Sequence, residues 1–489
     1  MNLAAYRADA EDFVSSLDRE YYLHFAGHQD EFDIEAIYER HGDLFTRENV
    51  ARLREEGTPQ LVEFAVHGLM GRETKAEEAE LARREAALEI EVDGEPMPYR
   101  QSAVVQVNER DPERRAAIEA ARLEASAREL DPLLREMLER THALTRELGW
   151  PSMRAMCEEL SGIDLGALEQ QTSAFLDATE EAYEALVGGP LERELGFGFE
   201  RLRRSDFSFF FRAPSLDAAF SDARLLRSLE QTLDGLALHP PGVILDVEQR
   251  PKKTPRAFCS PVRVPDEVYL VIARRGGRDD FETLFHEAGH AQHFAHMPAG
   301  LPMEHRYLGD NSITESFAFL FQHLTNNPAW LQARLDVMDA EAIEAQARAA
   351  KLVFLRRYAA KLAYELELHS GTAALDSLPE VYARRLGGAL HVDWPSQSWL
   401  SDVDPFFYAA SYIRAWALET HVRRLLRERF GELWFDEREA GDFLKKLWAE
   451  GQRMRGDELL HQLTGAQLDF GALLEDLRVT TNQAAARCR

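Results

Sequence analysis

Cysteine is scarce in this sequence, and the cysteines that it has are far apart. They are Cys157, Cys259 and Cys488, an odd number without any short spacing between them. Small domains that depend on disulfides carry an even set of closely spaced cysteines and occur in oxidising compartments. The pattern therefore argues against a disulfide framework, and we expect a cytoplasmic protein.

Long apolar runs and an excess of positive charge are also missing. No stretch reaches the roughly 18 apolar residues that a membrane-spanning helix needs, and residues 1–24 lack the apolar core of a secretory signal. The chain has 57 Lys and Arg against 85 Asp and Glu, which gives a formal net charge of -28. Because nucleic acids and anionic membranes are bound by basic surfaces, we expect neither as a partner.

Helical periodicity dominates the 489 residues, with two interruptions. Residues 88–108 alternate on both sides of Asp93-Gly94, which predicts a β-hairpin with a long loop. The runs 243–247 and 268–272 are short, apolar and bounded by proline and glycine, which predicts two strands. We therefore expect a mostly α protein with one small antiparallel sheet.

The segment that follows this sheet carries the strongest chemical signal, His286-Glu287-Ala-Gly-His290. Residues four apart lie on one face of an α-helix, so His286 and His290 can bind the same metal ion. Glu287 lies one residue further round, where it can reach a water on that ion and act as general base. The motif predicts one catalytic Zn²⁺ per chain.

A catalytic zinc needs a third protein ligand and a position left open for water. The longer motif H-E-x-x-H-x-x-G-x-x-H would supply His296, but His293 stands where that motif has glycine. If the helix continues, His296 is turned about 240° away from His290. Glu315 is the better candidate, because a charge in the apolar helix expected from residue 311 is costly unless it is paired or bound to metal.

Other interpretations of this region stay open. Ser312 and Glu315 have the spacing of a capping box, in which Glu315 would only bind a backbone N–H. Further candidate ligands are Glu304, His305 and Asp310.

Several segments resemble the thimet oligopeptidase and oligoendopeptidase F family of zinc peptidases. The first is the His286–His290 motif followed by Glu315 twenty-five residues later. The others are Ala257-Phe-Cys-Ser-Pro, Phe281-Glu-Thr-Leu-Phe, the helix expected at 357–369, and Phe407-Tyr408-Ala-Ala-Ser-Tyr412. The resemblance spans roughly residues 240–450.

The resemblance implies a two-lobed, mostly α fold with a deep channel that admits short peptides. We expect a helical N-terminal lobe over 1–240 and a catalytic lobe over 241–489, joined as one continuous fold. It also implies roles for single residues: His286, His290 and Glu315 as zinc ligands, Glu287 as base, and Tyr408 and Tyr412 as groups that reach the substrate or stabilise the oxyanion. The family often has a further tyrosine where Arg414 stands here.

The expected function is that of a zinc-dependent metallopeptidase that hydrolyses short peptides, held antiparallel to the edge strand 268–272. One alternative is a carboxypeptidase or peptidyl-dipeptidase, which needs a cation for the substrate's terminal carboxylate. Candidates for that cation are Arg356, Arg357, Lys361 and Arg414. A second alternative is a non-catalytic helical protein with a structural zinc.

Overall fold

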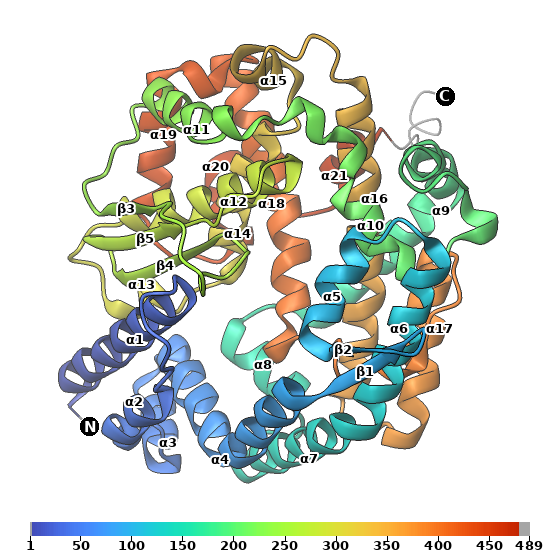
Figure 1. The fold of residues 1–489 in the computed structure, drawn as a ribbon. Helices are drawn as coiled ribbons and strands as arrows, with labels where there is room; N and C mark the ends of the chain where they lie inside the picture. Colours follow the sequence, from blue (N-terminus) through green and yellow to red (C-terminus); the bar gives the residue numbers. More distant parts are fainter. Residues whose placement is uncertain (1, 479–489) are drawn as a thin grey trace, which may run out of the picture. The chain divides into compact units, whose positions relative to one another are not determined.

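The computed structural model describes residues 2–478, which form two compact units assembled from separate segments (Figure 1). The first unit contains residues 2–65, 216–344 and 411–476, and the second contains residues 66–215 and 345–410. The expected division at residue 240 does not coincide with this one, because residue 240 lies within a segment of the first unit.

Most of each unit is helical, as predicted. The first unit contains α1 (Leu3–Phe25), α2 (Ile34–Arg40), α3 (Arg47–Glu56), α11 (Asp222–Leu236), α12 (Arg278–Ala295), α13 (Met303–Tyr307), α14 (Asn311–Leu324), α15 (Pro328–Leu335), α19 (Arg438–Trp448), α20 (Gly456–Thr464) and α21 (Gly471–Asp476). The second contains α5 (Tyr99–Asn108), α6 (Pro112–Glu129), α7 (Asp131–Glu147), α8 (Met153–Ser161), α9 (Leu165–Leu195), α10 (Phe207–Arg212) and α17 (Leu378–Leu390). Residues of both units occur in α4 (Pro59–Ala87), α16 (Glu341–Leu368) and α18 (Tyr408–Phe430). None of the described helices is both long and apolar enough to cross a membrane.

The sheet of the first unit has three strands in the order β3-β5-β4, namely β3 (Val243–Asp246), β5 (Glu267–Val271) and β4 (Phe258–Arg263). β5 pairs parallel with β3 and antiparallel with β4, so the sheet is mixed rather than antiparallel. The predicted strand 268–272 corresponds to β5, which lies in the middle with both edges paired. The prediction that a peptide binds along a free edge of this strand is therefore wrong, and the edge next to α12 belongs to β4.

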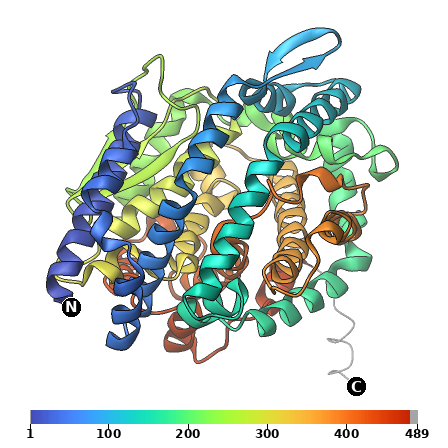
Figure 2. The same cartoon turned by 90° about the horizontal axis from the view of Figure 1, so that it is seen from below.

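The second unit contains the predicted β-hairpin, which is shorter than expected (Figure 2). β1 (Glu89–Val92) and β2 (Glu95–Pro98) are joined by Asp93 and Gly94 alone, both with positive φ, as a tight two-residue turn requires. Residues 99–108 form α5 instead of the second strand, and Ser102 and Gln106, four apart, are its buried positions. A short run of β-branched residues did not distinguish a strand from a helix.

Within the first unit, α12 packs closely against α14 (Figure 1). α12 carries the histidine motif and α14 carries Glu315, so this packing brings them together. Gly289, between the two motif histidines, permits this approach. A Cβ at this position would lie 2.5 Å from the carbonyl oxygen of Phe317 and 2.6 Å from Cα of Ala318, both of which are backbone atoms.

We expect Gly289→Ala to push α12 and α14 apart. Overpacking of this kind costs about 1–3 kcal/mol, although alanine is otherwise the better helix former. The variant should therefore unfold at a lower temperature than wild type, which calorimetry would measure. Gly188→Ala in α9, where an added Cβ meets nothing within 4 Å, is the matched control. Equal effects of the two substitutions would contradict the packing argument.

Candidate metal centre

His286, His290 and Glu315, the three residues predicted to bind zinc, converge in the structure. One ligand atom from each lies within 4.8 Å of the other two, and among the described residues this is the set of three such groups that converges. Nε2 of His286 is 3.4 Å from Oε2 of Glu315, and Nε2 of His290 is 3.8 Å from the same oxygen. In a tetrahedral zinc site with ligand distances of about 2.0–2.1 Å, ligand atoms lie about 3.3–3.4 Å apart. The donor set and its spacing therefore fit zinc.

The outer nitrogens of both histidines are held by residues of α14. Nδ1–H of His286 donates to Oε1 of Gln322 at 3.0 Å, and Nδ1 of His290 is hydrogen-bonded to Oγ1 of Thr314 at 2.8 Å. Such partners fix the ring orientation and leave Nε2 for the metal. Sequence reasoning missed both residues. Helical periodicity could have pointed to Gln322, because it lies two turns after Glu315 and so on the same face of the helix.

Burial and the Glu315 carboxylate set the protonation of the two histidines. Burial lowers the pKa of His290 to about 4, so this imidazole is neutral at pH 7, as a metal ligand must be. Burial also acts to lower the pKa of His286, but the hydrogen bond and negative charge of Glu315 outweigh it and raise that pKa. The pKa values of the two buried imidazoles therefore shift in opposite directions.

Glu287 lies next to the edge of the sheet. Its Oε2 accepts the backbone N–H of Cys259 in β4 at 2.9 Å. Burial raises the pKa of Glu287 to about 7, into the range suited to a general base near neutral pH. The carboxyl group is therefore positioned by two elements, α12 and β4.

Glu315 lies in the second turn of α14 rather than at its cap. The N-cap is Asp310, whose side chain accepts the backbone N–H of Ser312 at 3.0 Å. Ser312 is therefore inside the helix, and the capping-box interpretation of Ser312 and Glu315 is wrong. A better cap, an aspartate, precedes the helix by one residue.

The other candidate ligands have different partners. The helix does continue through His293, and His296 follows its last residue, with Nδ1–H donating to the carbonyl of Gln292 at 2.8 Å. Glu304 accepts two hydrogen bonds from Nε of Arg7, at 2.9 and 3.0 Å. Neither His296 nor Glu304 belongs to the converging group.

The two predicted tyrosines both lie on α18, but they belong to different units. Tyr412 is in the first unit, with its ring 5.9 Å from the ring of Phe319 on α14. Phe319 also contacts His286, at 5.1 Å between ring centroids. Phe319 thus contacts both Tyr412 and His286. Tyr408 is the first residue of α18 and belongs to the second unit.

The cations proposed for a substrate carboxylate are engaged elsewhere. Arg356 binds Glu180 at 2.6 Å, Lys361 binds Asp404 at 2.8 Å, and Arg357 pairs with Asp402. Arg414 binds Asp310 and Asp457. All four side chains are mostly buried, so the structure does not favour action at a free C-terminus.

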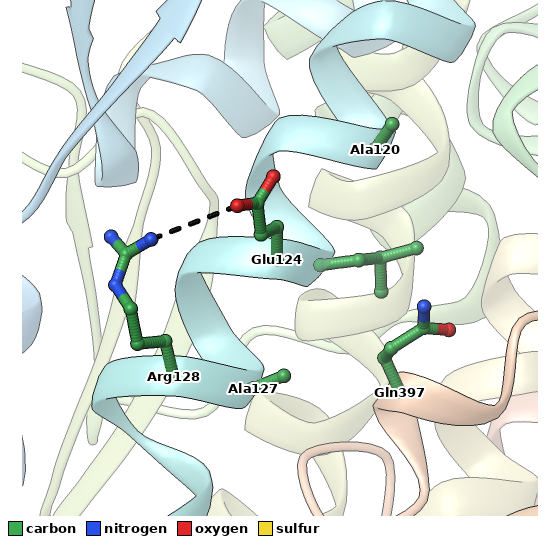
Figure 3. Close-up of a pocket in the computed structure, with 6 residues that line it drawn as sticks. Ala120, Glu124, Ala127, Arg128 and Gln397 are labelled. Atoms are coloured by element: carbon green, nitrogen blue, oxygen red, sulfur yellow. Dashed lines mark ion pairs between the residues drawn. The ribbon is translucent and has the colours of Figure 1, made fainter.

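The second unit carries a separate pocket of about 710 Å³ (Figure 3). Among its lining residues only Glu124 and Arg128 are charged, and they lie 3.8 Å apart as an ion pair. The remaining lining residues are Ala120, Leu123, Ala127 and Gln397. This lining offers neither a metal ligand set nor a nucleophile.

Comparison with known proteins adds a likeness at the level of the fold. No protein-family model matches the sequence, and no curated protein does. Among solved structures, a protein of Bacillus anthracis str. Ames provisionally assigned as oligoendopeptidase F matches with a TM-score of 0.67 at 15% identity. The match covers 98% of this chain and 89% of that one. The expected mostly α peptidase fold is thereby confirmed: the chain shares the fold of that oligoendopeptidase F structure.

Proposed function

We propose that this protein is a zinc-dependent metallopeptidase that hydrolyses peptide bonds in short peptides. The observation that carries the proposal is the convergence of His286, His290 and Glu315, with the buried carboxyl group of Glu287 beside them. A structural zinc site has no need of a fourth, ionisable group at this place. The fold shared with the oligoendopeptidase F structure supports the same class of enzyme.

His286, His290 and Glu315 would hold the metal ion. Bound there, Zn²⁺ would polarise the carbonyl group of the peptide bond and lower the pKa of a water molecule. Thr314 and Gln322 keep the two imidazoles in the orientation that this binding requires.

Glu287 is the proposed base. Its carboxylate takes the proton of the attacking water and later gives it to the leaving amine. The hydrogen bond from Cys259 fixes one carboxyl oxygen, so the group keeps its direction while it gains and loses the proton. Tyr412, and Tyr408 four residues earlier on α18, are the proposed phenol donors for the negative charge that develops on the carbonyl oxygen.

The peptide would bind along the outer edge of β4. The N–H of Cys259 points to Glu287 and so away from β5, and in an antiparallel pair the carbonyl of the same residue points to the same side. Main-chain pairing at this edge holds a peptide without reading its side chains, next to the proposed base. β4 thus replaces the strand 268–272 as the proposed substrate strand.

Digestion of a mixed library of short peptides, followed by mass spectrometry, tests the proposal. We expect internal cleavage that a zinc chelator abolishes and added zinc restores. Cleavage of a peptide and its C-terminally amidated twin should be equal, because the four candidate cations are already paired. Loss of cleavage on amidation would favour a carboxypeptidase or peptidyl-dipeptidase. Stoichiometric zinc without any hydrolysis would favour a structural zinc site and contradict the proposal.

A further inference from the structure

Arg414 lies on α18, two residues after Tyr412, and only 4% of its surface is exposed. Its Nη1 is 2.7 Å from Oδ2 of Asp310, the N-cap of α14. Its Nη2 is 2.8 Å from Oδ1 of Asp457, in the first turn of α20. One guanidinium group therefore joins three helices of the first unit, and its planar fork suits this two-sided contact better than an ammonium group would.

Asp310 is the centre of this junction. Its carboxylate accepts the N–H of Ser312 at 3.0 Å and that of Gly456 at 2.9 Å, besides its contact with Arg414. Burial acts to raise the pKa of Asp310, but the charge of Arg414 and these hydrogen bonds hold the pKa below its ordinary value. A buried carboxylate that stays ionised needs all of these partners, so the start of α14 depends on Arg414.

The helix that begins at this junction, α14, carries one of the three converging ligands and the two residues that orient the other two. Thr314, Glu315 and Gln322 on α14 hold or orient the metal site. The ring of Phe319, on the same helix, lies 5.1 Å from His286 and 5.9 Å from Tyr412. α14 therefore contacts both α18, which carries Tyr412, and α12, which carries the two histidines.

The contact of Arg414 fixes how α18 lies along α14. Arg414 is about 3 Å along the helix axis from Tyr412, and a slip of one residue would move Tyr412 by about 1.5 Å and turn it by about 100°. Aromatic contacts such as that of Phe319 with Tyr412 tolerate small slips, whereas two charge-assisted hydrogen bonds do not.

We propose that Arg414 is a positioning residue that sets α18 against the start of α14, so that Glu315 and Tyr412 keep their places around the metal site. The inference rests on the proposed function, because it concerns the geometry of that same site. It does not require Arg414 to touch a substrate.

The test compares Arg414→Met and Arg414→Lys with Arg424→Met. Arg424 is also on α18, but it is half-exposed and paired with the exposed Glu475. Zinc affinity, by competition with a chelator, and kcat and KM on one peptide are measured at a temperature where each variant is fully folded. We expect Arg414→Met to lose about 10-fold in zinc affinity, the lower end of the cost of losing a direct partner of a ligand, because Arg414 acts through Asp310. It should also lower kcat more than it changes KM. Arg414→Lys should lie between it and wild type, and Arg424→Met should match wild type.

Asp457→Asn keeps the test decisive if Arg414→Met does not fold. This variant removes one arm of the junction but leaves Arg414 paired with Asp310, and it should shift zinc affinity and kcat in the same direction by a smaller factor. A merely structural Arg414 would give variants with lower Tm but with zinc affinity and kcat within about twofold of wild type, which would overturn the proposal. A wild-type protein that neither binds zinc nor cleaves peptides would instead overturn the proposed function.

Discussion

Replacement of Glu287 by glutamine should abolish most peptide hydrolysis while the protein keeps its zinc. The amide cannot take the proton of the attacking water, and loss of a general base costs about 10²- to 10⁴-fold in rate. Glu287 is not one of the three converging ligands, so zinc affinity should stay near that of wild type. The glutamine oxygen can still accept the N–H of Cys259, and a neutral group is less costly to bury than a carboxylate, so stability should not fall.

The measurement combines kcat on a reporter peptide, the metal content after dialysis, and Tm. Asp279→Asn is the control, because it makes the same chemical change on an exposed position of α12. Hydrolysis at the wild-type rate by zinc-loaded Glu287→Gln would show that another group serves as base.

Replacement of Glu315 by glutamine should release the metal. The change keeps the size of the side chain but removes the charge that lies 3.4 Å from His286 and 3.8 Å from His290. Loss of an outer partner costs about 10- to 100-fold in metal affinity, and loss of a direct ligand should cost more than 100-fold. When zinc is limiting, the rate of peptide hydrolysis should fall together with the zinc affinity.

Chelator competition would give the zinc affinity, and a thermal scan without metal would give the stability. Glu428→Gln, on the exposed face of α18, controls for a general effect of charge. If Glu315 only supported the fold, its replacement would lower Tm and leave zinc affinity unchanged, and the proposed ligand set would have to be abandoned.

The part of the site that lies within one helix could be predicted from the sequence. His286, Glu287 and His290 follow from helical periodicity, which depends only on neighbouring residues. Glu315 could be found because an acid is conspicuous within an apolar segment. The mostly α fold followed for the same reason, since helices are formed by local contacts.

What could not be predicted depends on contacts between distant segments. The order of β3, β5 and β4 depends on pairing between strands, and the sequence of one strand does not specify its neighbours. The sequence therefore did not show that β5 is the central strand and not an edge strand. The roles of Gln322 and Thr314 require the close approach of α12 to α14. Arg414 looked like a candidate for a substrate carboxylate because its partner, Asp310, is 104 residues away in the chain.

The cap of α14 has a consequence for the order in which the protein is made. Asp310 meets Arg414 and Gly456, which lie 104 and 146 residues later in the chain. Protein synthesis therefore releases His286, His290 and Glu315 well before the residues that secure the start of α14, the helix that carries Glu315. So large a loop closes only once both of its ends exist. The contacts at the start of α14 are thus completed late, and a partly synthesised chain carries the three converging side chains without these contacts.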